Sequence, residues 1–221
     1  MRCTFVCASD INDSTFMNQI DIIRRSDPAI IRGYASWLYL LANYMKKANI
    51  TNIQPKAIMT TGEPLYPHFR NVIESQFNCK IFDGYGGEEI PVSFECEEHD
   101  EYHICEETTI AEFIKNNEPV SAGELGDIVL TSLDNYAMPF IRYKINDLGI
   151  PSDEPCNCGR GLSTMKAIVG RDTDIVSTPD GKFLLGLFFV DLFENMTTTV
   201  SYTHLRAHET RHDLVCRLLL E

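Results

Sequence analysis

The first part of the chain alternates short apolar runs with longer segments in which apolar residues recur every three or four positions. The short runs are typical of buried strands, and they cover residues 29–31, 56–60 and 79–82. Between them, the spacing predicts helices over 36–49 and 67–77, with Ser36 as the N-cap of the first. This order favours parallel strands joined by right-handed crossovers.

After residue 89 the pattern changes to shorter segments broken by polar turns. We expect antiparallel strands within 91–104 and 110–131, and a strand at 141–143 that leads into a polar turn at Asp147. A charged turn at 170–174 is typical of a hinge between domains. The sequence therefore predicts an α/β fold, with a parallel β-α-β-α-β unit followed by a small antiparallel region.

Polar turns follow each predicted parallel strand, at 33–36, 60–63 and 83–89. Parallel strands end at one edge of their sheet, and ligands of open α/β sheets bind outside that edge. The third turn, Asp83-Gly84-Tyr85-Gly86-Gly87-Glu88-Glu89, combines glycines, an aromatic ring and carboxylates. Such a turn suits a flat ring, a phosphate and a metal ion, so we predict a nucleotide site.

Composition and net charge limit the classes of partner that we expect for the chain. The chain is 44% hydrophobic and 23% charged, as in ordinary globular proteins, and its net charge of −13 disfavours nucleic acid and anionic membranes as partners. No apolar run approaches the roughly 18 residues of a membrane span. The N-terminal residues lack the pattern of a signal peptide, so we expect a cytoplasmic protein.

The eight cysteines are too few and too irregularly spaced for a secreted disulfide scaffold of this length. Cys156 and Cys158 lie in a polar loop where packing does not explain them, and Cys96 and His103 flank an acidic turn. Three thiolates and an imidazole form a tetrahedral zinc set, so a structural Zn²⁺ is one interpretation. Ordinary reduced thiols, with His103 in the active site, are the other.

The last stretch differs from the rest of the chain. His204, His208 and His212 are spaced to line one face of a helix, which would suit a metal. The string from 201 to 212 also resembles the translation of a sequencing adapter. We therefore expect residues 200–221 to be a non-native tail.

Several motifs occur in an order that is typical of one family. They are Thr60-Thr61-Gly62-Glu63, Tyr85-Gly86-Gly87-Glu88-Glu89, the segment from Tyr136-Ala137-Met138-Pro139-Phe140-Ile141-Arg142-Tyr143 to Asp147, Cys156-Asn157-Cys158-Gly159-Arg160, and Gly170-Arg171. Over residues 28–196 the chain resembles the phenylacetate–CoA ligase-like proteins, CapK-type members included, of the adenylate-forming superfamily. The resemblance implies that residues 1–170 are the C-terminal portion of the AMP-binding large domain. Residues 171–199 would then be the hinge and the start of the small C-terminal domain.

The reaction implied by the resemblance joins ATP and a carboxylic acid, aryl or acyl, into an acyl-adenylate and then forms a thioester with coenzyme A. Its cofactors would be ATP, Mg²⁺ and CoA, and an oligomer is compatible with it. The alternative is a non-catalytic nucleotide-binding or polysaccharide-biosynthesis accessory protein of the same fold.

The resemblance also implies roles for single residues. Glu89 would hold Mg²⁺ and Asp147 the ribose hydroxyls. The adenine would be surrounded by Tyr85, Gly86, Gly87, Gly62 and Glu63. Arg171 would lie near ribose or phosphate, and Tyr34 would form part of the acyl-pocket wall. Each of these side chains also has a structural interpretation, such as a core-edge ring, a turn cap or a surface ion pair.

The chain departs from the family pattern at two positions and at both ends. Glu88 replaces a threonine that would meet a phosphate, and Asn146 replaces a glycine before Asp147. Asparagine tolerates positive φ, so that turn is expected to survive. The family's phosphate loop and its catalytic lysine have no counterpart here, so we expect an interior fragment that is inactive by itself.

Overall fold

The structure is a computed structural model that describes residues 3–7, 13–87, 90–171, 175–177 and 183–185, without the side chains of Asp13, Arg171 and the last two segments. The chain divides into two compact units, Met1–Val169 and Gly170–Glu221. In the second unit, β11 (Ile175–Ser177) pairs antiparallel with β12 (Phe183–Leu185). The predicted tail and most of the predicted hinge lie outside the described residues, so both stay predictions.

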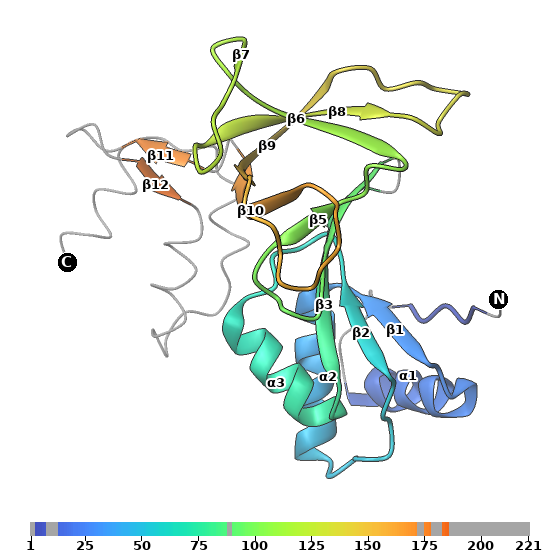
Figure 1. The fold of residues 1–221 in the computed structure, drawn as a ribbon. Coiled ribbons are helices and arrows are strands. Elements are labelled where there is room, and N and C mark those ends of the chain that lie inside the picture. The colour runs from blue at the N-terminus through green and yellow to red at the C-terminus, as the bar shows by residue number, and fades with distance from the viewer. Residues whose placement is uncertain (1–2, 8–12, 88–89, 172–174, 178–182, 186–221) are drawn as a thin grey trace. The chain divides into compact units, whose positions relative to one another are not determined.

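Parallel strands with helices around them form one part of the first unit (Figure 1). The elements are α1 (Asp13–Ser26), β1 (Ile30–Gly33), α2 (Ala35–Lys47), β2 (Ala57–Thr60), α3 (Pro67–Phe77) and β3 (Lys80–Gly86). Strand β2 lies between β1 and β3 and pairs parallel with both. The predicted β-α-β-α-β unit is therefore confirmed.

The helices agree with the local sequence pattern, except that one predicted N-cap was wrong and one helix was not predicted. Helix α3 covers the predicted residues because Pro67 suits the first turn and Asn78, at φ 50°, takes the left-handed conformation that ends a helix. The prediction that Ser36 caps α2 was wrong, since Tyr34 is the N-cap and Ser36 lies inside the first turn. Helix α1 was not predicted, although its buried residues Phe16, Ile20 and Ile23 are spaced by three or four.

The helices and parallel strands share one hydrophobic core. Trp37 of α2 lies in it, and its indole N–H donates a hydrogen bond to Gln19 of α1 at 3.3 Å. Fully buried members of this core include Ile20, Leu38, Leu41, Met45, Ile58, Ile73, Phe77 and Ile81. Burying side chains of this size stabilises the fold by about 1.5–3 kcal/mol each.

Strand β3 continues further than the sequence suggested. We expected a turn from Asp83, but the strand continues to Gly86 and pairs antiparallel with the next strand, Gly84 opposite Phe94. Glycine permits this, because a Cβ at Gly84 would lie 2.7 Å from the Phe94 ring and 3.0 Å from the Thr60 carbonyl oxygen. Gly86, at φ +140°, then turns the chain close to the backbone of Ile90.

The rest of the first unit is antiparallel, and helices gather around β1–β3 rather than around these strands (Figure 1). The strands are β4 (Pro91–Glu95), β5 (Tyr102–Ile104), β6 (Thr109–Lys115), β7 (Glu118–Pro119), β8 (Gly126–Ser132), β9 (Tyr143–Ser152) and β10 (Thr164–Arg171). The sheet order is β1-β2-β3-β4-β5-β10-β9-β8-β6-β7. A second core under these strands includes Val92, Ile128, Leu130 and Met165. The predicted small antiparallel region is confirmed.

The turn predicted at Asp147 is replaced by strand β9 in the structure. The strand starts at Tyr143, and Asp147 lies within it. Asp127 pairs with Leu148 and Val129 with Lys144, so residues 145–147 all lie opposite Ile128 in a bulge. Asn146 takes φ 63° there, which confirms that asparagine accommodates the positive φ at this position.

The structure has no helix, among the residues that it describes, with the length and apolar character needed to cross a membrane.

Candidate active site

The carboxyl ends of the three parallel strands lie in register. Gly33 is paired with Thr60, and Thr60 with Asp83. The segments that follow these positions therefore meet at one edge of the sheet, as predicted from the order of the elements. Tyr34 and Gly62 are in contact there, because a Cβ at Gly62 would lie 2.9 Å from Tyr34 Cε1. Tyr34 itself is 54% exposed, so one side of the ring is open to a ligand.

Glu63 fixes the helix that leaves this edge. Its Oε2 accepts a hydrogen bond from the backbone N–H of Ser36 at 2.9 Å. A carboxylate at this place satisfies a free N–H of the first turn of α2 and complements the helix dipole. The side chain that the sequence analysis placed beside adenine therefore also holds α2 against the β2 turn.

A buried polar network lies beneath the edge. Asp83 accepts hydrogen bonds from the hydroxyl groups of Thr60, at 2.5 Å, and Tyr102, at 2.8 Å. Burial raises the pKa of Asp83, and the two hydroxyl groups partly oppose that rise. Burial and the nearby Asp83 carboxylate also raise the pKa of Tyr102. No role was predicted for this network, because the sequence does not show that Thr60 and Asp83 would both be buried at neighbouring strand ends.

A second pair connects α3 to this network. Arg70 binds both carboxylate oxygens of Glu95 at 2.7 Å and donates to the backbone oxygen of Ile81 at 2.7 Å. Glu95 Oε2 in turn accepts the backbone N–H of Asp83 at 2.9 Å. The Glu95 side chain is only 7% exposed, so this ion pair is nearly dry and fixes the start of the glycine-rich segment.

Tyr85 and Asp147 meet across the sheet. The Tyr85 hydroxyl donates a hydrogen bond to Asp147 Oδ2 at 2.7 Å, although the two residues are 62 positions apart. Both are half-buried, and Tyr85 packs against the second core. Gly86 leaves β3 beside them, and the backbone N–H of Gly87 donates to the oxygen of Ile90 at 3.1 Å. The structure thus brings the predicted aromatic and ribose-binding residues into contact.

The structure does not describe the side-chain contacts of three residues that were named from the sequence. Glu88 and Glu89 lie outside the described residues, and the side chain of Arg171 is not described. The Mg²⁺ role of Glu89 and the ribose or phosphate role of Arg171 stay predictions.

Cys96, His103, Cys156 and Cys158 form a separate cluster. Their ligand atoms all lie within 4.8 Å of one another. Cys96 Sγ lies 3.6 Å from Cys156 Sγ, and Cys158 Sγ lies 3.3 Å from His103 Nε2. Burial lowers the pKa of His103, and the charge of Arg160 acts in the same direction. The sequence analysis named all four residues.

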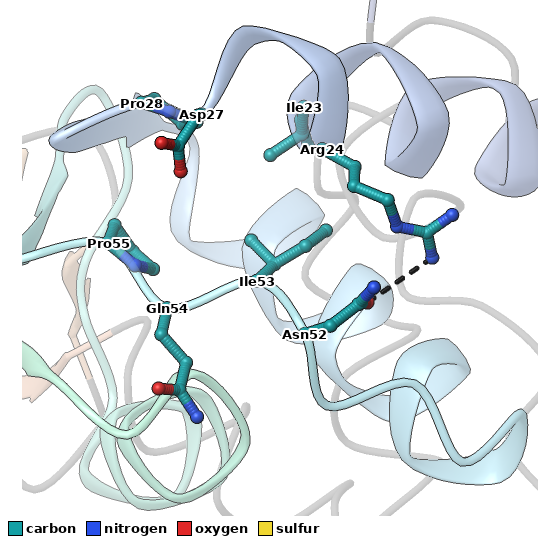
Figure 2. Close-up of a pocket in the computed structure, with 8 residues that line it drawn as sticks. All are labelled: Ile23, Arg24, Asp27, Pro28, Asn52, Ile53, Gln54 and Pro55. Carbon is teal, nitrogen blue, oxygen red and sulfur yellow. Dashed lines mark hydrogen bonds between the residues drawn. The ribbon is translucent and has the colours of Figure 1, made fainter.

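One small hollow lies away from both sites. It is lined by residues 23 and 24 near the end of α1, by residues 27 and 28 just after it, and by residues 52–55 before β2 (Figure 2). These positions are at the amino ends of β1 and β2, opposite the carboxyl edge. Its volume of about 20 Å³ suits a water molecule rather than a nucleotide.

Known proteins resemble the chain in sequence. Phenylacetate-coenzyme A ligase of Thermus thermophilus is 30% identical over 72% of this chain and 37% of its own length. The predicted relationship to the phenylacetate–CoA ligase-like proteins is confirmed. Protein CapK of Staphylococcus aureus is 25% identical over 71% of the chain and 34% of its own length. No protein-family model matches.

The fold of this ligase-like chain also occurs in solved structures. A 2-hydroxyisobutyryl-CoA ligase in the postadenylation state, in complex with R3-HIB-AMP, superposes with a TM-score of 0.74 at 21% identity, over 85% of this chain and 42% of its own. The predicted adenylate-forming fold is thereby confirmed. The chain spans 37% of the length of the Thermus ligase that it matches.

Proposed function

We propose that the chain supplies the nucleotide-binding edge of an AMP-forming acid–CoA ligase. The supporting observation is the in-register edge of Gly33, Thr60 and Asp83, next to the hydrogen bond from Tyr85 to Asp147. The Thermus relative and the fold neighbour are CoA ligases, which supports this class of reaction. The substrate would be a carboxylic acid, aryl or acyl, with ATP and CoA as the other reactants.

The nucleoside would be bound by residues of β3 and β9. The Tyr85 ring would stack on adenine, while Gly86 and Gly87 let the base approach the backbone. Asp147, which accepts the Tyr85 hydroxyl at Oδ2, would accept hydrogen bonds from the ribose hydroxyls. Gly62 would border the base, and Glu63 would position that border through α2.

The acid and the phosphates would lie at the other end of the site. Tyr34, exposed above Gly62, would form part of the acyl-pocket wall. Glu89 would hold Mg²⁺, which neutralises phosphate charge during attack by the substrate carboxylate, and Arg171 would bind ribose or phosphate. The cytoplasmic location, an oligomeric state and the lack of a nucleic-acid partner also stay predictions from the sequence.

Binding of a non-hydrolysable acyl-adenylate analogue, an acyl sulfamoyl adenosine, tests the proposal. We expect titration calorimetry to detect binding to the chain and Asp147→Asn to weaken it about tenfold or more. Asp134→Asn is the matched control, since Asp134 lies outside this edge. Absence of binding to the unmutated chain, or equal weakening by the control, would contradict the proposal.

Glu88, which stands where the family has a threonine that would meet a phosphate, favours a second candidate, a nucleotide-binding protein of the same fold without catalysis. The two candidates differ in turnover. ATP–pyrophosphate exchange that depends on a carboxylic acid, measured on the full reading frame, supports the ligase. Analogue binding without exchange supports the non-catalytic protein.

A further inference from the structure

The Cys/His cluster lies outside the nucleotide-binding edge and is assembled from distant parts of the chain. Cys96 follows β4 directly, His103 is in β5, and Cys156 and Cys158 lie in the loop before β10. Cys96 and His103 are buried, and the other two are half-buried. Soft sulfur and imidazole donors that converge from three segments are the ligand set of structural zinc sites.

Two separations within the cluster are close to those of a tetrahedron around one ion. With Zn–S near 2.3 Å and Zn–N near 2.0–2.1 Å, a tetrahedral site separates two sulfurs by about 3.8 Å and a sulfur from a nitrogen by about 3.6 Å. The observed separations are 3.6 Å for Cys96 Sγ to Cys156 Sγ and 3.3 Å for Cys158 Sγ to His103 Nε2. A disulfide would need sulfurs about 2.05 Å apart, so the Cys96–Cys156 pair is not oxidised.

The loop around Cys156 and Cys158 also presents backbone groups to sulfur. Cys156 hydrogen-bonds the backbone of Cys158, and Cys158 hydrogen-bonds the backbone of Arg160. Gly159, at φ +77°, makes the turn between them, and its N–H donates to the oxygen of Cys156 at 3.2 Å. Arg160 further carries a positive charge beside Cys158 and pairs with Glu97 at 3.1 Å. These contacts fix the turn that brings Cys156 and Cys158 into the cluster.

We propose that Cys96, His103, Cys156 and Cys158 bind one structural Zn²⁺. Binding would release the three thiol protons to solvent, while the imidazole binds as the neutral ring. The ion has four protein ligands and no open position, so its role is structural rather than catalytic.

The proposed ion would connect the loop before β10 to the β4–β5 hairpin. That hairpin contains Glu95, which holds the backbone of Asp83 at the glycine-rich segment. Loss of the ion would therefore loosen the support of the nucleotide-binding edge without removing any residue that contacts the ligand.

Metal content of the full chain, purified without chelator and dialysed against Zn²⁺, is the direct test. We expect about one zinc ion per chain, and Cys156→Ser and Cys158→Ser each to reduce it to near zero. Cys105→Ser is the matched control, because Cys105 follows β5 closely yet lies outside the cluster. It should keep the zinc. An unmutated protein without zinc, or a control that loses it too, would overturn the proposal.

A second measurement uses only the unmutated protein, so it does not depend on whether a variant folds. In the zinc-loaded protein, the three cluster thiols should react with a disulfide reagent only after a chelator is added. Substitution with Co²⁺ should give the d–d bands of a tetrahedral thiolate site. Thiols that react equally with and without chelator would contradict the proposal. The adenylate-analogue titration distinguishes this outcome from failure of the proposed function, because zinc content does not depend on nucleotide binding.

Discussion

At the carboxyl edge of the parallel strands, the side chains of single residues are in close contact with a few neighbouring groups. Asp83 is buried with two hydroxyl donors, and Gly62 lies under the ring of Tyr34. The sequence analysis identified Gly62 from its motif, but gave Asp83 no function because a strand end says nothing of the hydroxyls that will surround it. Two predictions belong to this scale.

Asp83→Asn should change how stability depends on pH. Burial raises the pKa of Asp83, so the folded state favours the protonated form. Its contribution to stability is complete below the unfolded pKa near 3.8 and is lost as pH rises through the folded pKa. The unfolding free energy of the unmutated protein, relative to Asp83→Asn, should therefore fall as pH rises. Each tenfold difference between the folded and unfolded acid dissociation constants corresponds to a fall of about 1.4 kcal/mol.

Urea unfolding of both proteins from about pH 4, just above the unfolded pKa, to about pH 8 measures this difference. A difference that stays constant with pH, or that grows as pH rises, would show that Asp83 does not titrate as its burial implies.

Gly62→Ala should cost both stability and ligand affinity. Alanine at φ +75° is strained by about 1 kcal/mol, and its Cβ would displace Tyr34. Gly123→Ala is the matched control, since Gly123 has φ +84° and nothing lies within 4 Å of an added Cβ. Both variants should lose similar stability in urea unfolding, but only Gly62→Ala should weaken binding of the adenylate analogue. Equal ligand affinity in the two variants would remove Tyr34 from the proposed pocket.

At the scale of elements, the predicted helices and parallel strands agree with the structure because their cores follow simple periodic patterns. The antiparallel segments were placed less well. Strand β3 extends through Gly84 because a glycine lets the Phe94 ring approach, and the bulge at Asn146 places Asp147 within β9. Both features depend on neighbouring strands, which local patterns do not specify.

The ion pair between α3 and β4 should be the strongest polar link between elements. Arg70→Ala leaves the buried Glu95 carboxylate without its bidentate guanidinium partner, with only His99 Nδ1 at 3.2 Å and the Asp83 N–H at 2.9 Å, so we expect a loss of about 3 kcal/mol in unfolding free energy. The double variant Arg70→Ala with Glu95→Gln should recover part of that loss. Arg24→Ala, which breaks an exposed pair with Asp21, should cost less than about 0.5 kcal/mol. Similar losses for the two single arginine variants would mean that burial of Glu95 carries no penalty.

At the scale of the first unit, one sheet joins the parallel strands to the antiparallel ones, and side-chain contacts also link strands that are distant in it. The Tyr85–Asp147 hydrogen bond is one of these contacts, and it connects β3 to β9. Neither residue predicts the other from sequence spacing.

Tyr85→Phe removes the hydroxyl group that donates to Asp147. We expect it to weaken binding of the adenylate analogue about tenfold and to lower the unfolding free energy by about 1 kcal/mol. The double variant Tyr85→Phe with Asp147→Asn should bind no more weakly than Asp147→Asn alone if the hydroxyl acts through the carboxylate. Tyr143→Phe, on the exposed start of β9, should bind as the unmutated protein does. Strictly additive losses in titration calorimetry would mean that Tyr85 and Asp147 contact the ligand independently.

The sequence by itself determined the order of the parallel strands with helices α2 and α3, the parallel pairing and the family relationship, because apolar periodicity and motif order are local properties of the chain. It also selected the four zinc-type ligands by residue type. Only the tertiary structure decided that these four converge, that Tyr85 contacts Asp147 and that Asp83 is buried under two hydroxyls. The Tyr102–Asp83, Cys96–Cys156 and Tyr85–Asp147 contacts join residues 19 to 62 positions apart, and strand pairing and burial, rather than spacing, bring them together.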